Sequence, residues 1–277
     1  MLSTPLPGGD LYACARCGLQ FRHPTLTPSQ YADLYRQVET THWQSSTLRL
    51  DESYVLHKLT GLPKEGASVL DVGCFTGTVL NRLPASVQKF GIEPSEQARD
   101  ICAANGIHII GRSFEELVDA GNSFDAVISL DVIEHVPDPL HFLHCLARVT
   151  KPGGVLIIAT GDADSPVWKF VGPAYYYSQN PEHISFISAR WCQFAAEKLG
   201  LRLDEVRHPE RWGEERPASL STALSGWVTV GAKLVLSRLE YLLARMTAGR
   251  DGTYAPRFAV GRPRLARDHL LAAFVKT

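Results

Sequence analysis

Residues 68–77 read Ser68-Val-Leu-Asp71-Val-Gly73-Cys-Phe-Thr-Gly77, a short apolar run that ends in a turn with a glycine at each end. The apolar run predicts a buried strand, and the glycines allow the chain to turn sharply into a helix expected at 78–83. In an open α/β sheet such a turn lies at the carboxyl ends of the strands, where a ligand can approach the backbone. The stretch therefore predicts a strand–turn–helix unit that forms part of a ligand site.

Beyond this unit the chain keeps alternating between short apolar runs and helical patterns. Further strands are expected at 87–92, 107–110, 124–130, 155–159, 201–206 and 268–275, and helices at 96–105, 139–149 and 189–199. Continuous apolar strands that alternate with helices indicate a parallel sheet buried on both faces. The sequence therefore predicts an α/β fold, a Rossmann-like, doubly wound sheet of seven strands whose last strand, 268–275, pairs antiparallel at the edge.

Composition indicates a globular protein and narrows its partners. The chain has 277 residues, 45% of them hydrophobic, so it can bury a core and is not expected to be disordered. With 28 basic and 29 acidic residues its net charge is −1, which excludes a general positive field for nucleic acid. Its start shows no basic-then-apolar leader pattern and its six cysteines are scattered, so we expect reduced thiols in a cytoplasmic protein.

A carboxylate after the second strand bears on which ligand the turn accepts. Glu93 stands 22 positions after Asp71, where it can accept both hydrogen bonds of an adenosine ribose diol. A dinucleotide site favours glycine in the middle of the turn, so that the backbone packs against the pyrophosphate, but this chain has Phe75 there. Asp71 would repel phosphates and attract the ammonium and sulfonium of S-adenosylmethionine. These residues favour S-adenosylmethionine over NAD.

Four segments, in this order, resemble the class I S-adenosylmethionine-dependent methyltransferases. They lie within residues 68–160 at the family's spacing and are Asp71–Gly77, Gly91–Ser95, Ser123–Pro139 and Lys151–Gly154. Within the class, the chain is most similar to methyltransferases of types 11 and 23, the branch that contains the ubiquinone-pathway O-methyltransferases. That family usually has glycine at the position of Phe75.

The resemblance also implies which residues hold the donor. Asp71, Gly73, Cys74 and Gly77 are expected around its methionine part. Arg49 resembles an arginine that meets the donor's carboxylate in the ubiquinone enzymes, and a surface arginine is the alternative. Glu93 is expected on the ribose, and the residues expected around the adenosine and the donor sulfur are Pro94 or Ser95, Ser113 or Phe114, and Leu130.

The segment after the fifth strand offers a general base for a hydroxyl acceptor. His183 is the preferred base because histidine titrates near neutral pH, and the alternative is a histidine that ties the lid to the sheet. The lid is the irregular aromatic stretch 168–186, where relatives place an acceptor-binding segment. Three consecutive tyrosines, Tyr175, Tyr176 and Tyr177, either line the acceptor pocket or pack beneath the lid.

Asp131, Glu134 and His135 form a second candidate group after the fourth strand. In the ubiquinone enzymes such a group is associated with a divalent cation, so the resemblance implies a cation such as magnesium on these three residues. In the alternative, Glu134 and His135 hydrogen-bond the loop. Asp131 and His135 are also candidate catalytic residues.

Cys14-Ala-Arg-Cys17-Gly18 resembles the second half of a zinc ribbon that precedes some methyltransferases of this kind. A structural zinc takes four ligands, and this chain offers Cys14 and Cys17 with His23 as a third candidate. Three explanations stay open: a vestigial knuckle, a zinc site completed by a second chain, and a sequence that starts too late.

These segments divide the chain into four expected parts. They are an N-terminal cysteine knuckle and helical cap (1–60), the S-adenosylmethionine-binding core (61–209), a C-terminal helical insertion on the acceptor side (210–264) and the final core strand (265–277). The helical cap includes a helix expected at 28–59. The apolar segment 217–246 is expected to cap the acceptor site or form a dimer face, and membrane-surface contact is the alternative. The protein is expected to be a monomer or a homodimer.

The predicted function is S-adenosylmethionine-dependent methylation of a small molecule, with S-adenosylhomocysteine as product. The expected acceptor is a hydroxyl of a phenol, a sugar or a natural-product intermediate. Two alternatives stay open: transfer to nitrogen or carbon, and a cofactor-binding interaction protein without activity. An NAD-dependent oxidoreductase is disfavoured by Phe75.

Overall fold

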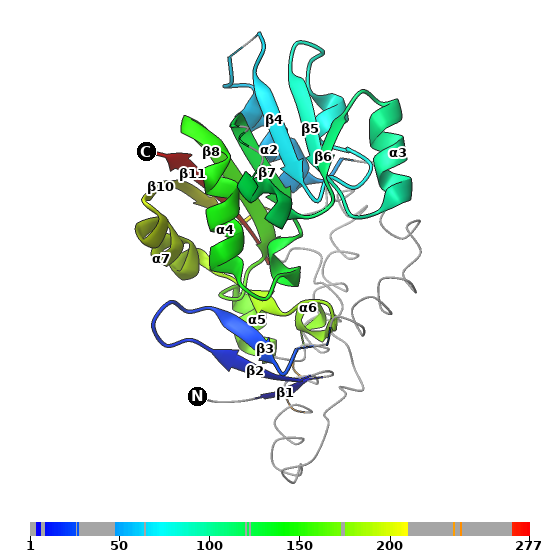
Figure 1. Cartoon of the computed structure of the whole chain (residues 1–277). Coiled ribbons are helices and arrows are strands. Elements are labelled where there is room, and N and C mark those ends of the chain that lie inside the picture. The colour runs from blue at the N-terminus through cyan, green and yellow to red at the C-terminus, as the bar shows by residue number, and fades with distance from the viewer. Residues whose placement is uncertain are drawn as a thin grey trace, which may run out of the picture.

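The computed structural model describes residues 4–6, 9–25, 27, 48–63, 65–119, 121, 123–172, 175–209, 235, 239 and 268–277. These residues form two sheets (Figure 1). The large sheet has seven strands in the order β10-β11-β8-β7-β4-β5-β6, and the small one has four in the order β1-β2-β3-β9. The predicted seven-stranded, doubly wound α/β sheet is confirmed.

The strands of the large sheet pair in parallel, except where β11 pairs with its two neighbours. Its parallel strands are β4 (Ser68–Val72), β5 (Gln88–Ile92), β6 (His108–Gly111), β7 (Phe124–Leu130) and β8 (Thr150–Gly161). The remaining two are β10 (Leu201–Arg207) and β11 (His269–Lys276). β11 runs antiparallel to both β8 and β10, so the predicted antiparallel last strand is confirmed.

The position predicted for that strand is wrong. β11 lies between β8 and β10, and β10 is the edge strand. Residues 269–274 of β11 are buried, because it has neighbours on both sides and its apolar run is covered on both faces. β10 carries charges such as Arg202 and Asp204, which an edge strand tolerates and which discourage pairing with another chain.

Helices cover both faces of the large sheet (Figure 1). They are α2 (Leu50–Leu59), α3 (Glu96–Ala104), α4 (Pro139–Arg148) and α7 (Ala189–Leu199). α4 and α7 share one apolar cluster with Leu70 of β4, whereas α2 and α3 share another with Val69. Since successive side chains of a strand point to opposite faces, all of β4 is buried.

Of the helix predicted at 78–83, only residues 80–82 are helical, as the single 3-10 turn η2 (Leu80–Arg82). Pro84 follows one residue after the turn and cannot continue a helix, because it lacks an amide hydrogen. Two further 3-10 helices, η3 (Phe114–Asp119) and η4 (Ile133–His135), follow β6 and β7.

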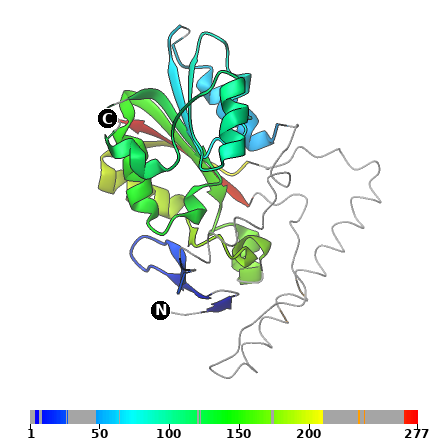
Figure 2. The same ribbon diagram turned by 45° about the vertical axis from the view of Figure 1, so that its right-hand side comes forward.

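A small sheet joins the N-terminal segment to the lid. β1 (Thr4–Leu6), β2 (Gly9–Ala13) and β3 (Gln20–His23) pair antiparallel, and β9 (Ser185–Phe186) pairs with β3. Figure 2 shows this N-terminal hairpin (residues 9–23) below the core, beside the lid. No strands were predicted here, because the apolar runs are short and broken by glycine and proline.

The lid is more regular than predicted. It begins within α5 (Pro166–Val171) and contains α6 (Tyr176–Gln179) and β9. Ser165 caps α5 by accepting a hydrogen bond from the Trp168 amide, with Pro166 at the first helical position. Leu11 of the hairpin packs with aromatic side chains of the lid, namely Trp168, Tyr175, Tyr177 and Phe186.

The predicted division into four parts stays a prediction. Residues 28–47 and, apart from 235 and 239, the predicted insertion 210–264 lie outside the described residues, and so does the segment 217–246 apart from those two positions. Among the helices that the structure describes, none is long and apolar enough to cross a membrane.

Candidate functional site

The carboxyl ends of β4 to β8 meet at one edge of the large sheet, the carboxyl edge. The chain proceeds from β4 to β5 and β6 on one side and from β7 to β8 on the other, so the strand order reverses between β4 and β7. In doubly wound sheets a crevice opens at this point and ligands bind in it.

The predicted glycine turn follows β4 at this edge. Gly73 and Gly77 have φ angles of +82° and +77°, a region that L side chains rarely adopt. A Cβ on Gly73 would lie 2.4 Å from Val132 Cγ2, and one on Gly77 would lie 2.2 Å from Ile107 Cδ1. Backbone conformation therefore favours glycine at both positions, and at Gly73 a Cβ would also collide with the branched side chain of Val132.

Glu93 lies directly after β5 with both carboxylate oxygens held by the backbone. Its Oε2 accepts a hydrogen bond from the Phe75 amide at 2.9 Å, and its Oε1 accepts one from the Ser95 amide at 2.8 Å. Burial raises the pKa of Glu93, although both amides act in the opposite direction. The glycine turn and the acidic residue are thus joined in one hydrogen-bonded unit.

Asp71 adds a buried carboxyl group beside this unit. It is buried, and burial together with Glu52 and Glu93 raises its pKa to about 8, while Arg49 acts in the opposite direction. Burying a carboxylate near two others disfavours its charged form, and a cationic ligand would relieve the repulsion. The electrostatics of this edge therefore suit a cation better than a phosphate.

Arg49 is engaged by several carboxylates at the start of α2. Its Nη1 lies 2.9 Å from Asp131 Oδ2, its Nε 3.1 Å from Asp51 Oδ1 and its Nη2 3.6 Å from Glu52 Oε1. Arg49 is thus at the carboxyl edge rather than an isolated surface residue. A ligand carboxylate would share this guanidinium with the protein's own acidic groups.

The other residues predicted to bind the methyl donor also lie at the carboxyl edge. Ser95 caps α3 through the Ala98 amide, Pro94 is exposed, and Leu130 is half-buried at the end of β7. The Ser113 amide donates to Glu116, and Phe114 packs edge-on against Phe142. Cys74 is buried in the turn, with its Sγ 3.9 Å from that of Cys102.

Glu134, His135 and His183 come together beyond β7, with one potential ligand atom from each within 4.8 Å of the others. Among the described residues, this is the only group of three or more such side chains. Asp131, predicted with Glu134 and His135, is not in the group. Its Oδ2 pairs with Arg49 instead, and its backbone is held at φ +55°.

The lid backbone orients both imidazoles. His183 Nδ1 lies 2.8 Å from Tyr177 O, and His135 Nδ1 lies 3.2 Å from Glu182 O. Because a carbonyl can only accept, each Nδ1 carries the hydrogen, so in the neutral ring Nε2 keeps the lone pair. The two rings meet edge to face with their centroids 4.9 Å apart.

Tyr175 and Tyr177 are buried, and their hydroxyls donate hydrogen bonds to carboxylates of the protein. Tyr177 donates to Glu134 Oε1 at 2.5 Å, and Thr160 donates to Glu134 Oε2 at 2.8 Å. Tyr175 donates to Asp268, and Tyr176, half-buried, lies 3.4 Å from the same carboxylate. These contacts favour the packing alternative for Tyr175 and Tyr177.

The cysteine pair lies in the turn between β2 and β3. Hydrogen bonds from the Cys17 amide, the Cys17 thiol and the Arg16 amide lower the pKa of Cys14, whereas burial raises that of Cys17. In the register of the hairpin, His23 lies opposite Asp10, at the end away from the cysteine turn. Gln20, opposite Ala13, lies beside that turn, and His23 is three residues, roughly 10 Å, further along the strand. His23 is therefore wrong as a third zinc ligand.

Arg22, Thr160 and Asp268 were not predicted as residues of the site. Asp268 carried a usable signal, because the start of an antiparallel strand lies at the same edge as the ends of its parallel neighbours. Arg22 carried none, since a single arginine in a short strand is ordinarily solvated.

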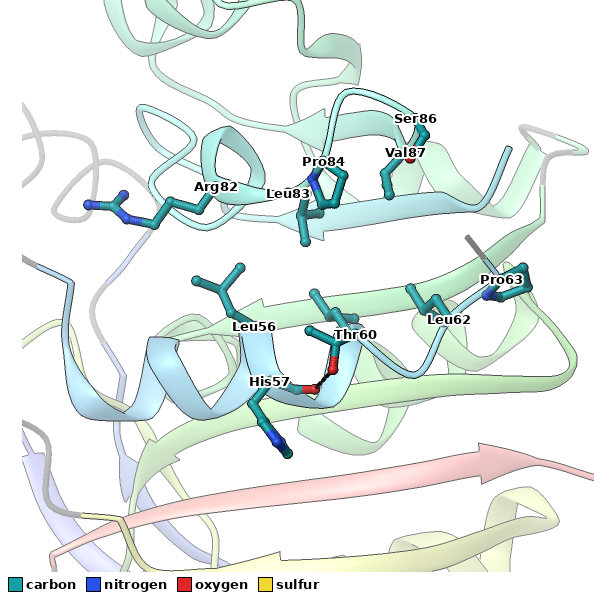
Figure 3. A pocket seen from close by; sticks show the side chains of 11 residues that line it. Leu56, His57, Thr60, Leu62, Pro63, Arg82, Leu83, Pro84, Ser86 and Val87 are labelled. Atoms are coloured by element: carbon teal, nitrogen blue, oxygen red, sulfur yellow. Dashed lines mark hydrogen bonds between the residues drawn. The ribbon is translucent and has the colours of Figure 1, made fainter. Parts of the chain in front are cut away.

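The structure has an apolar cavity elsewhere, with a volume of about 440 Å³. Figure 3 shows it between the end of α2 and the loop before β5, lined by Leu56, Leu62, Leu83 and Val87 among others. It lies at the amino ends of β4 and β5, opposite the carboxyl edge. We place the candidate site at the carboxyl edge, where the buried carboxylates and histidines are.

Residues 48–206, more than half of the chain, match the family model Methyltransf_23, described as a methyltransferase domain. The chain is 38% identical over 107 residues to a ubiquinone biosynthesis O-methyltransferase of Rhizobium leguminosarum bv. trifolii, covering 35% of this chain and 42% of that protein. It is 37% identical over 178 residues to the Alkalilimnicola ehrlichii protein of the same name, covering 61% and 65%. The chain thus spans less than two thirds of these curated relatives.

Solved structures share the fold at low identity. One is Haemonchus contortus phosphoethanolamine N-methyltransferase 2 in complex with S-adenosyl-L-methionine, with a TM-score of 0.53 and 17% identity over 93% of this chain and 61% of that one. Another is the YcgJ protein of Bacillus subtilis, with a TM-score of 0.51 and 15% identity over 81% and 98%. At these identities the likeness concerns the fold alone.

Proposed function

Because the chain belongs to the methyltransferase-domain family, we propose that it transfers the methyl group of S-adenosylmethionine to a hydroxyl of a small molecule. One observation carries the proposal: buried Glu93 is fixed by two backbone amides beside the glycine turn, directly after β5, the strand next to β4 at the carboxyl edge. A fixed carboxylate at this position suits the two hydroxyls of a ribose.

The acidic surroundings support the choice of donor. S-adenosylmethionine supplies, when bound, a methyl group already activated on a sulfonium, and it also carries an ammonium. Asp71, whose pKa is raised to about 8, favours a cationic group nearby, since a cation stabilises its charged form. Asp71, Gly73, Cys74 and Gly77 are proposed around the methionine part, and Glu93 on the ribose. The residues proposed around the adenosine are Pro94, Ser95, Ser113, Phe114 and Leu130.

His183 is the proposed general base for an oxygen acceptor. With Nδ1–H donated to Tyr177 O, its Nε2 can accept the proton of a hydroxyl as the oxygen bonds the methyl carbon. The electron pair of the breaking S–C bond stays on sulfur, which gives S-adenosylhomocysteine. An oxygen acceptor is also supported by the names of the curated relatives, ubiquinone biosynthesis O-methyltransferases.

A divalent cation on Glu134, His135 and His183 is the second candidate for the acceptor side. One carboxylate and two imidazoles within 4.8 Å are a donor set that transition metals accept. A cation there would lower the pKa of a hydroxyl that binds it. Each Glu134 oxygen already accepts one hydroxyl, from Tyr177 or from Thr160, so a cation would bind through a remaining lone pair.

The test measures donor binding and turnover separately. Calorimetry with S-adenosylmethionine, S-adenosylhomocysteine and NAD is expected to show binding of the first two alone. Transfer of labelled methyl from S-adenosylmethionine is then measured with catechol, a sugar and a primary amine, before and after removal of metal by a chelator. Donor binding without transfer to any acceptor would favour an interaction protein, and transfer to the amine alone would overturn the oxygen acceptor. Loss of transfer with the chelator would favour the cation.

A further inference from the structure

Arg22 lies buried in the N-terminal hairpin, with its guanidinium directed at the lid backbone. Its relative exposure is 1%. Its Nε donates to His183 O at 3.2 Å, and its Nη2 donates to Ser178 O at 2.8 Å and to Asn180 O at 3.1 Å. One side chain thus binds three carbonyls within six consecutive residues, and these bonds offset part of the cost of burying its charge.

The segment that Arg22 binds is the one that orients the two histidines. Tyr177 O and Glu182 O accept from the Nδ1 atoms of His183 and His135. The Arg22 amide donates to Ile184 O at 2.9 Å, and the Ile184 amide donates to Glu134 O at 2.8 Å. Residues 177–184 are therefore held between the hairpin on one side and Glu134–His135 on the other.

We propose that Arg22 is a positioning residue for methyl transfer, which fixes the lid carbonyls and through them the imidazoles of His135 and His183. The proposal rests on the proposed function, because it assigns the two histidines to the acceptor side. It makes the N-terminal hairpin a part of the catalytic site, although the hairpin lies more than 150 residues from His183 in sequence.

Other contacts hold the hairpin in place without touching this segment, which separates positioning from simple attachment. Arg190 Nη2 donates to Ala15 O at 2.7 Å and to Arg16 O at 3.1 Å, at the far turn of the hairpin. Trp168 Nε1 donates to Gln20 Oε1 at 3.1 Å. Arg190→Met therefore removes an arginine that anchors the hairpin while the carbonyls of residues 178–183 keep Arg22, and it is the matched control.

The experiment compares Arg22→Met, Arg22→Lys and Arg190→Met with the unaltered protein. Calorimetry gives the Kd for S-adenosylhomocysteine, and labelled S-adenosylmethionine with catechol gives kcat. Arg22→Met is expected to lower kcat at least about tenfold, because small displacements of a catalytic group are costly, and to leave Kd within about twofold. Arg22→Lys, which keeps a cation but fewer donors, is expected to fall between. In a His183→Ala background, Arg22→Met is expected to cause no further loss.

Hydrogen exchange supplies a readout that does not need turnover. Arg22→Met is expected to speed amide exchange in residues 178–184 and to leave β4 and β7 unchanged, whereas Arg190→Met leaves residues 178–184 unchanged. Equal exchange in Arg22→Met and the unaltered protein would overturn the proposal. So would an equal loss of kcat with and without His183, or a loss of donor affinity that matches the loss of kcat.

Failure of the proposed function has a different signature. It appears as an unaltered protein that methylates none of the acceptors, and the exchange result then still decides whether Arg22 holds the segment. If Arg22→Met does not fold, as circular dichroism would show, the same comparisons are made with Arg22→Lys.

Discussion

The carboxyl edge around Gly73 and Glu93 and the sheet shared by hairpin and lid are built in opposite ways. At the carboxyl edge, the turn and the carboxylate lie 20 residues apart in sequence and on adjacent parallel strands, and they are joined by the Phe75 amide. At the lid, Arg22 and His183 are separated by 161 positions and meet only because β3 pairs with β9. Donor binding should therefore depend on local features, and acceptor chemistry on long-range assembly.

The largest effect is expected for His183→Ala, which removes the proposed general base and none of the residues proposed to bind the methyl donor. Loss of a general base typically lowers kcat by about 10²- to 10⁴-fold, and the Kd for S-adenosylhomocysteine should stay unchanged. His144→Ala, an exposed histidine of α4, is the control for removing an imidazole. A fall in kcat below about tenfold would show that another group takes the proton.

Glu93→Ala should weaken binding of the methyl donor and of its product. Two hydrogen bonds from a ribose to a charged group are worth about 1.5–3 kcal/mol each, so we expect Kd for S-adenosylhomocysteine to rise at least about 100-fold. Glu96→Ala, three positions along and exposed in the first turn of α3, is the control. Calorimetry that finds equal Kd values for the two variants would contradict the role proposed for Glu93.

Asp71→Asn should stabilise the folded protein but weaken its binding of the methyl donor, which sharpens the comparison. The folded pKa of Asp71 is about 8, above an unfolded value of about 4, so the folded state holds the extra proton between these limits. The unaltered protein therefore loses stability as pH rises through this window, by at most about 1.4 kcal/mol per pH unit. The variant should gain a melting-temperature advantage that grows from pH 4 to pH 8 and then levels off.

The control for Asp71→Asn is Asp100→Asn, an exposed aspartate of α3. Its melting temperature should follow that of the unaltered protein at every pH. Because Asp71 is proposed beside the donor's ammonium, Asp71→Asn should also bind S-adenosylmethionine more weakly. An advantage that does not change with pH would mean that Asp71 is ionised in the folded protein.

The smallest effect is expected for Cys14→Ser, which tests the zinc prediction in the hairpin. Serine can accept the amide hydrogen bonds that Cys14 receives, so a loss of about 1 kcal/mol or less, a few degrees of melting temperature, is expected. Metal analysis of the purified protein accompanies it. A stoichiometric zinc lost in the variant, with a large drop in melting temperature, would establish a zinc site that needs ligands beyond those described.

Much of the fold could be read from the order of residues alone. The strand β4, its glycine turn and Glu93 follow from local rules, because a buried strand needs a continuous apolar run and a sharp turn needs glycine. The seven strands and the antiparallel last one could be predicted for the same reason. The edge position of β11 could not, because pairing partners are chosen by whole-sheet packing.

Tertiary structure alone brought Arg22 to the backbone of residues 178–183, brought His183 in place of Asp131 to Glu134 and His135, and gave Tyr177 to Glu134. Short strands such as β3 and β9 have too little apolar periodicity for their pairing to be predicted. A buried arginine cannot be told from an exposed one in the sequence. Local order in the sequence therefore specified the residues proposed to bind the methyl donor, whereas contacts between distant segments decided which side chains are proposed to face the acceptor.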